Sequence, residues 1–534
     1  MKKARYFGLG LMVMLLTIGF LGLVEAQAQD TVAVINGQPV ILSDPAVAFD
    51  WYDTQAVYNL YSPLVYPTVE GGLRPHLAES WETVGGRLNH WRFKLRSGVK
   101  FHDDSELTAE DVVFSMNRFL TIGQGYSSIL GTVVPIAIDR YTVDFLLGQP
   151  NAEFPTTLTL FWTVNKDLVL EHLGPGEYGR FGDYGQEWLS THDAGSGPYM
   201  LVSHSPGDRL EAERFEDYFL GWKSGANEVP IDRLLFIMES NPATLLTLLK
   251  TGQLDIEANG GWSRTTLADI DRTPGLRRFP VWTQNITVWI NTAVPPTDDV
   301  HFRRAILNAY DYGAVFDQYS PFGARFGGVY SASLPGFLEG ILPQQQNLVK
   351  ARQELALSKY DPSDVKVVFH YCCDLKSEEE IGLQLQADLA QLGVEVEIVN
   401  LPWPQYSAES TAPETTPNMS IFLFPIVYPS PDSFMFFMFH PDNVGGIYAS
   451  HWFADQGIGQ LIDRARATLD SDDRIGIYQE LQRKIADQAV ALYAYEIPTQ
   501  FTVQDYLVGP EKPFPIVGPT IDMHNWRIDT TRRR

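Results

Sequence analysis

The sequence predicts an α/β protein of at least two lobes, and three features lead to that fold class. A strand, a helix and a second strand follow one another within residues 365–398. The Gly- and Asp-rich stretch 174–197 is typical of a loop at a domain boundary. The chain has 534 residues, and since a domain usually has about 100–200 residues, two to four domains are expected.

The strand–helix–strand segment gives the clearest local signal. Apolar and polar residues alternate over 365–369, and again over 394–398, which predicts two strands. Between them, one helical stripe is apolar, and Gly393 is placed to end the helix. Strands joined in this way are parallel, with a right-handed crossover. The stripe consists of Ile381, Leu385, Leu389 and Leu392.

Other segments add strands and helices on both sides of the boundary loop. Residues 80–101 predict a β-hairpin that turns at Gly85-Gly86. Thr108 and Asp111 form a capping box, which predicts the start of a helix. A second lobe is expected to begin near Asn285. The remaining predicted elements are strands near 199–202 and 234–238 and helices near 243–250 and 473–489.

The first thirty residues predict export from the cytoplasm. Lys2, Lys3 and Arg5 precede an apolar stretch, and Ala26-Gln27-Ala28 supplies the small residues that a signal peptidase needs. We therefore expect residues 1–28 to be a cleaved signal peptide. The alternative is an uncleaved membrane anchor, because the apolar stretch approaches the span of a bilayer. With no cysteine near the cleavage point for a lipid anchor, the mature protein is expected to be free in the periplasm.

The charge of the chain argues against a nucleic-acid partner. The formal net charge is −25, and the longest basic cluster is Arg532-Arg533-Arg534. An acidic protein without a basic patch repels nucleic acid and anionic lipid.

Two adjacent cysteines, Cys372 and Cys373, are the only ones in the chain. They cannot join distant parts of the fold, so its stability is expected to come from its cores. A disulfide between the two is one alternative. Two separate, half-buried cysteines at a strand end are the favoured one, and we expect no metal site there.

Several motifs, in order along nearly the whole mature chain, resemble one protein family. That family is the bacterial extracellular solute-binding proteins of family 5, which serve ABC importers for peptides, nickel and some oligosaccharides. The motifs are Leu77-Ala-Glu-Ser-Trp81, the runs Trp91 to Asp103 and Leu107 to Ser115, Gly195-Ser-Gly-Pro-Tyr199, Asn291-Thr292, Asp299 through Asp311, and Pro431-Asp-Ser-Phe434.

The resemblance implies a two-lobed periplasmic-binding-protein fold, of the Venus flytrap type, with an extra inserted domain. Transferred to this chain, residues 29–60, 192–285 and 500–534 form a hinge-containing lobe. Residues 61–191 form the inserted domain, and 286–499 form an opposing α/β lobe. The implied function is capture of an oligopeptide or oligosaccharide in the interlobe cleft by a monomer without a cofactor. The implied partner is an inner-membrane ABC permease.

Aromatic residues are the first candidates for solute contact, because a cleft for polar solutes needs aromatic faces and a few placed polar groups. Trp403 follows the second strand of the βαβ unit, at the carboxyl end where α/β sheets bind ligands. It also matches a family position that lines the peptide pocket, although core packing is the alternative. Phe424 stands where the family often has a cleft tryptophan, and Tyr428 follows in the same loop.

Four further candidates depend on their place in the chain. Asn285 and Asn291 flank the expected crossing between the lobes. Tyr126 lies in the Gly123-to-Ser128 loop, and Trp262 follows Gly260-Gly261; either could instead pack on a core edge.

One departure from the family bears on the solute. Where peptide-binding members have an aspartate that pairs with the ammonium group of the peptide, this chain has Val427. Leaving a buried ammonium unpaired costs several kcal/mol. Either another acid substitutes, for which Asp432 is the nearest candidate, or the solute carries no such ammonium, as in a neutral oligosaccharide.

A secreted hydrolase acting on a glycan or peptide is the competing class. The sequence contains no G-x-S-x-G, H-E-x-x-H or G-x-x-x-x-G-K-[ST] motif, and we assign no catalytic residue. His102, Asp103, Asp104 and Glu106 resemble a metal cluster, but a turn before the capped helix explains them better. A glycosidase carboxylate pair, or a chaperone or adhesin on the same fold, stays open at this point.

Overall fold

The computed structural model describes residues 31–37, 40, 43–49, 51–68, 72–258, 262–319, 325–373, 375–509 and 521–533. The expected signal peptide lies outside these residues. None of the helices in the described part has the length and apolar character required to cross a membrane.

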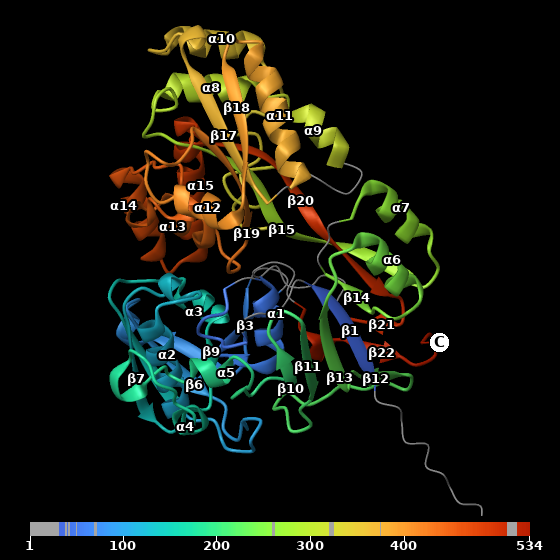
Figure 1. Ribbon diagram of the computed structural model, residues 1–534. Coiled ribbons are helices and arrows are strands. Elements are labelled where there is room, and N and C mark those ends of the chain that lie inside the picture. The colour runs from blue at the N-terminus through green and yellow to red at the C-terminus, as the bar shows by residue number, and fades with distance from the viewer. Residues whose placement is uncertain are drawn as a thin grey trace, which may run out of the picture.

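Two long strands join an upper and a lower lobe (Figure 1). β15 (Leu276–Ile290) and β20 (Ala491–Gln504) pair antiparallel over most of their length. Within the described residues they belong to an 11-stranded sheet of order β10-β11-β13-β1-β14-β20-β15-β19-β17-β18, in which β16 also pairs with β20. The lobes are therefore connected by continuous main-chain hydrogen bonding.

The upper lobe contains the predicted βαβ unit. β17 (Lys366–Cys372) and β18 (Glu395–Leu401) pair in parallel and are joined by α11 (Lys376–Ala390), which confirms that prediction. α11 lies close to β17 because Gly382 has no side chain; a Cβ there would come within 2.6 Å of the Phe369 ring. The other elements of this lobe are α8 (Val300–Ala309), α9 (Tyr312–Tyr319), β16 (Arg325–Phe326), α10 (Leu348–Leu357), α12 (Trp403–Glu409), β19 (Met419–Pro425), α13 (Asp432–Phe439), α14 (Gln456–Arg466) and α15 (Ser471–Gln488).

The lower lobe carries the other end of the large sheet. β1 (Val32–Gly37) lies between β13 and β14 and pairs in parallel with both. The predicted strands near 199–202 and 234–238 and the helix near 243–250 are confirmed. The elements are β10 (Tyr199–Ser205), β11 (Arg209–Arg214), β12 (Glu228–Pro230), β13 (Arg233–Met238), α6 (Pro242–Lys250), β14 (Ile256–Glu257), α7 (Arg264–Arg272), β21 (Leu507–Val508) and β22 (Arg527–Asp529).

A third body, which we call the insert, lies beside the lower lobe and below α12–α15 (Figure 1). Its four-stranded antiparallel sheet has the order β5-β6-β8-β7, and β5 and β6 form the predicted hairpin. The elements here are α1 (Trp51–Leu60), β2 (Ser62–Pro63), β3 (Val65–Pro67), β4 (Leu73–Pro75), β5 (Ala78–Thr83), β6 (His90–Leu95), α2 (Ala109–Ile122), β7 (Val133–Asp139), β8 (Thr142–Leu147), α3 (Phe154–Thr157), β9 (Trp162–Thr163), α4 (Lys166–Glu171) and α5 (Gln186–Leu189).

α2 begins at the predicted capping box. The backbone N–H and the hydroxyl of Thr108 both donate to Asp111 Oδ2, each at 2.9 Å. The apolar face of α2, including Val112, Met116 and Phe119, is buried. The predicted helix start is therefore confirmed.

The expectation of two separate cysteines was wrong. The structure joins Cys372 and Cys373 in a disulfide at the end of β17. Adjacent side chains of a strand point to opposite faces. Cys373 leaves the strand conformation, with φ of +65°, and this brings the two sulfur atoms to the same side. Its N–H donates to the Leu401 carbonyl at 3.0 Å, which ties the ends of β17 and β18 together.

Candidate functional site

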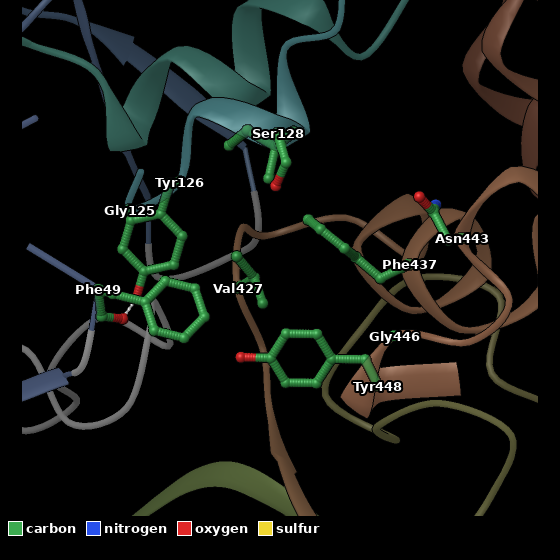
Figure 2. Close-up of a pocket in the computed structure, with 10 residues that line it drawn as sticks. Phe49, Gly125, Tyr126, Ser128, Val427, Phe437, Asn443, Gly446 and Tyr448 are labelled. Carbon is green, nitrogen blue, oxygen red and sulfur yellow. Dashed lines mark hydrogen bonds between the residues drawn. The ribbon is translucent and has the colours of Figure 1, made fainter. Parts of the chain in front are cut away.

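A cavity of about 220 Å³ lies between the insert and the upper lobe, and we call it the seam cavity. Figure 2 shows its two walls facing one another across an open space. One wall consists of Phe49, Gly125, Tyr126, Ser128 and Ile129, and the other of Val427, Phe437, Asn443, Gly446 and Tyr448.

A buried ion pair positions the wall on the insert side. The two terminal nitrogens of the Arg118 guanidinium donate to the Asp44 carboxylate, at 2.7 and 2.5 Å, and both side chains are buried. This pair fixes the segment 43–49 against α2. Gly125 then allows the next loop to approach that segment, since a Cβ there would lie 2.9 Å from the Ala48 carbonyl oxygen.

Tyr126 and Phe49 form the aromatic part of this wall. The Tyr126 hydroxyl donates a hydrogen bond to the Phe49 carbonyl, and their ring centroids lie 5.2 Å apart. Phe49 is 45% exposed, which is unusual for a phenylalanine held in place by its neighbours. The exposed ring faces the seam cavity (Figure 2).

The opposite wall is fixed by contacts behind it. Tyr428 donates to Asp432 Oδ2 at 2.8 Å, and Arg466 Nε lies 3.3 Å from the same oxygen. Asp432 is in the first turn of α13, where a negative charge is favoured by the helix dipole. Burial raises the pKa of Tyr428, so its hydroxyl stays protonated and remains a donor. The loop between β19 and α13 is thereby held with Val427 at the cavity.

Tyr448 connects the cavity to a row of aromatic rings in the upper lobe. Its centroid lies 6.4 Å from that of Phe49 across the seam and 5.4 Å from that of Phe422. Phe422 in turn lies 6.5 Å from Trp403. Phe424 packs edge-on against Tyr448 at 5.0 Å.

The predicted aromatic candidates therefore lie at different distances from the seam cavity. Tyr126 lies in the cavity wall, and Phe424 lies directly behind Tyr448 and is fully buried. Tyr428 is also fully buried, and its hydrogen bond to Asp432 helps to hold the loop that carries Val427. Trp403 is 48% exposed and lies at the end of the aromatic row, stacked near Tyr406 at 6.1 Å.

The two asparagines and Trp262 make contacts within the fold. Asn285 donates to the Gly328 carbonyl at 2.6 Å. Asn291 donates to the carbonyls of Pro413 and Thr416, at 3.0 Å each, and accepts from Ala293 N–H. Trp262 packs on the small core of Leu245, Leu249 and Leu254. None of the three is among the described residues that line the seam cavity.

The sequence prediction missed Phe49, Phe437 and Tyr448. Tyr448 follows Gly445-Gly446 and thus carries the same kind of loop signal as Tyr126 and Trp262. Phe437 lies in an apolar helix and Phe49 before a helix, where nothing in the local pattern distinguishes them from core residues.

A second cavity, of about 400 Å³, adjoins the first and shares Ile129 with it. It is more polar, and its lining includes Gln149, Asn151, His440 and Arg466. The Arg466 guanidinium stacks on the Phe436 ring, 3.8 Å from its centroid.

The side chains of the turn that contains His102 form hydrogen bonds within the fold. His102 Nδ1 lies 2.7 Å from Asp193 Oδ1, and Nε2 lies 3.0 Å from the Gly197 carbonyl oxygen. Asp103 accepts hydrogen bonds from Ser105 and from Asn165. Across the part of the chain that the structure describes, no group of three or more His, Cys, Asp or Glu residues is arranged to hold a metal ion.

A comparison with protein-family models identifies the chain. The model of the bacterial extracellular solute-binding proteins, family 5 (Middle), matches residues 72–446. The chain belongs to this family. The resemblance seen in the sequence motifs is thus confirmed, and the competing hydrolase class finds no support.

Relatives cover nearly the whole of this solute-binding protein. The probable D,D-dipeptide-binding periplasmic protein DdpA of Escherichia coli (strain K12) is 25% identical over 519 residues, which are 95% of this chain and 96% of the relative. The family contains substrate-binding transport proteins that work with a permease, rather than enzymes.

Solved structures confirm the two-lobed periplasmic-binding-protein fold. DppA from Helicobacter pylori, in complex with the peptide STSA, has a TM-score of 0.77 at 19% identity, with 93% of this chain and 98% of that chain covered. MoaA from A. tumefacien R10, in complex with mannopinic acid, has a TM-score of 0.76 at 19% identity, with 94% and 100% covered.

Proposed function

We propose that this solute-binding protein captures a small solute in the seam cavity and presents it to the membrane permease of an ABC importer. The observation that supports this site is that residues far apart in the sequence, from the insert and from the upper lobe, line one cavity. A ligand there touches both bodies at once. It therefore stabilises the closed arrangement over the open one, which is the difference that a transporter can recognise.

Contacts across the seam outside the cavity support such a closed arrangement. The N–H of Ala152 in the insert donates to the Arg466 carbonyl of α14 at 2.6 Å. Glu153 Oε1 lies 2.7 Å from Arg474 Nε of α15. Both contacts break when the two bodies separate, and they form again on closure.

The chemical class of the solute depends on the residues of this chain. The proteins named above are a probable D,D-dipeptide-binding protein and two proteins solved in complex with a peptide and with mannopinic acid, so the fold accepts several kinds of small solute. An oligopeptide and an oligosaccharide are the two classes that the sequence favours, and the aromatic walls of the seam cavity suit either.

A thermal-shift screen of the purified mature protein tests the proposal. The panel contains short peptides and both α- and β-linked oligosaccharides. A ligand at 100 times its Kd stabilises the folded state by about 2.7 kcal/mol, which gives a readily measured rise in Tm. We expect at least one compound to raise Tm and to be recovered unchanged by mass spectrometry. Recovery of a converted product would instead indicate an enzyme.

We also propose that the protein reaches the periplasm through cleavage after Ala28 and acts there as a monomer. The small residues at Ala26 and Ala28 support the cleavage site. Mass spectrometry of the exported protein tests it, because a mature chain beginning at Gln29 is expected and an intact amino terminus would indicate a membrane anchor.

A further inference from the structure

We propose that the part of the solute held in the seam cavity is an uncharged group with an apolar face, and that recognition requires no ammonium group. This inference rests on the proposed function, since it describes the ligand of the same site. It follows from the uncharged side chains that line the cavity in the described part of the chain, from the acid behind its wall and from the hydroxyl of Tyr448.

The lining of the seam cavity contains no carboxylate, ammonium, guanidinium or imidazole among the residues that the structure describes. Aromatic rings and the aliphatic Val427 and Ile129 make up most of its surface. An ammonium that left water for this surface would lose its hydration and gain no charged partner among these described lining residues. A sugar ring or another neutral group with an apolar face would instead stack on the rings.

Asp432, the acid directly behind this wall, is out of reach of a solute. Its side chain is 0% exposed. Oδ2 already accepts from Tyr428 and faces Arg466 Nε at 3.3 Å. Oδ1 makes no hydrogen bond, but it is buried and cannot contact a ligand in the cavity. The charge of Asp432 is thus balanced by Arg466 within the protein.

The acids that line the adjoining cavity do not serve as partners for an ammonium group in place of Asp432. Asp442 and Asp463 have side chains that are 86% and 67% exposed, and both face the His440 ring. Charges in such exposed positions are screened by water and contribute little to binding. The neighbouring Arg466 would in addition repel a cation in that cavity.

Tyr448 supplies the polar contact that a neutral solute needs. Its hydroxyl points across the cavity toward Phe49 and Tyr126 (Figure 2). It makes no hydrogen bond with the described part of the chain. Because a phenol both donates and accepts, it can pair with a sugar hydroxyl or an amide and does not require charge.

The experiment compares matched ligands that differ only in charge. Isothermal titration measures Kd for a series of short peptides with free amino termini, for the same peptides with acetylated amino termini, and for neutral oligosaccharides. For the wild-type protein, we expect at least one neutral compound to bind and acetylation not to weaken binding of any peptide.

Two substitutions of Val427 add a test that does not require the ligand of the wild-type protein to be known. Val427→Asp places a carboxylate in the cavity wall, and Val427→Asn is the uncharged control of the same shape. We expect Val427→Asp to favour free-amine peptides over acetylated ones by at least about tenfold, because only the aspartate offers a partner for the ammonium. The Val427→Asn variant should show no such preference.

Three results would overturn the inference. The first is wild-type protein that binds free-amine peptides at least about tenfold more tightly than their acetylated counterparts. The second is a Val427→Asp variant that folds, as shown by its circular dichroism and Tm, but gains no preference for amines. Failure of every compound in all three series would contradict the proposed function itself, and this inference with it.

Discussion

Glu378 is a buried carboxyl group in the first turn of α11, away from the walls of the seam cavity. It is 4% exposed, and it accepts a hydrogen bond from Cys372 N–H at 3.1 Å. Burial raises its pKa from 4.5 to about 7, and that hydrogen bond offsets only part of the effect. The same carboxylate lies near the buried Tyr406 and raises the pKa of that residue further.

The raised pKa of Glu378 predicts a loss of stability as pH increases. Between pH 4.5 and about 7 the folded state keeps a proton that the unfolded state has released. The contribution of this group to stability is therefore full below pH 4.5 and is lost as pH rises through 7. Glu378→Gln stays neutral, so relative to wild type it should gain up to about 3 kcal/mol between pH 4.5 and 8. Urea unfolding at several pH values measures the difference.

The neighbouring Glu379 provides the control. Its side chain is 31% exposed and pairs with Lys376 at the surface. Glu379→Gln should therefore change stability by less than about 0.5 kcal/mol at every pH. A constant difference between Glu378→Gln and wild type across this range would show that Glu378 is ionised in the folded protein throughout.

The sequence predicts individual site residues less completely than it predicts helices and strands. Loop composition singles out Tyr126 and a departure from the family pattern singles out Val427, and both line the seam cavity. Phe49 and Phe437 could not be predicted, since a buried core and a cavity wall select the same aromatic residues. Only the packing of distant segments distinguishes them. Asn291 was a candidate because of its place in the chain, but its amide nitrogen is used by two carbonyls.

At the scale of elements, the start of α15 meets the insert through one ion pair. Glu153 precedes α3 and is 5% exposed, and Arg474 lies in the first turn of α15. Burial raises the pKa of Glu153, and Asp432 nearby adds to this, whereas Arg474 lowers it. Neither residue lines the seam cavity or the adjoining cavity, so the ion pair can stabilise the closed arrangement without contacting a solute.

Arg474→Met is therefore expected to weaken solute binding without changing the cavity. Removing one partner of a buried pair leaves the other uncompensated, at a cost of about 3–5 kcal/mol. Because the pair forms only when the insert and upper lobe meet, its loss destabilises the closed state relative to the open state. We expect Kd to rise at least about tenfold, as measured by isothermal titration with a ligand from the screen.

Arg464→Met is the matched control, since Arg464 pairs with Glu480 at 3.3 Å within the upper lobe, with both side chains about half exposed. An exposed pair of this kind contributes about 0–1 kcal/mol and does not cross the seam. Equal affinities of the Arg474→Met variant and wild type would show that the contact does not control closure.

Elements themselves were largely predictable. The βαβ unit, the hairpin at Gly85-Gly86 and the capped start of α2 each carry a local signal of periodicity, turn residues or capping. The disulfide at the end of β17 was not predicted, because the alternation that identifies a strand says nothing about how its last residue leaves it. The Cys373 backbone conformation decides that pairing.

At the scale of the whole molecule, β15 and β20 carry the connection between the lobes. Both strands run through the expected crossing near residues 285 and 499, and the register of the pair shifts at Trp282/Gln284 and Ile286/Thr287. Such irregularities bend a strand pair locally. The division into 29–60, 192–285 and 500–534, then 61–191, then 286–499 stays a prediction, and strand pairing across β15 and β20 is consistent with it.

The oligomeric state is a further prediction at this scale. A protein that opens and closes around a solute needs both lobes free to move, and we expect a monomer with and without ligand. Light scattering coupled to gel filtration measures the mass, which should stay below the 60.0 kDa of the full chain after loss of the signal peptide. A mass near twice that value would indicate a dimer.

Isothermal titration of the best ligand into wild-type protein and two variants tests whether the seam cavity holds the solute. Tyr448→Ala removes an aromatic ring that faces Phe49 across the seam. Trp188→Ala removes a ring that stacks between His172 and His192 on the insert. We predict one site per chain, a loss of at least about tenfold in affinity for Tyr448→Ala, and unchanged affinity for Trp188→Ala. Unchanged binding by a folded Tyr448→Ala variant would contradict the claim that the seam cavity holds the solute.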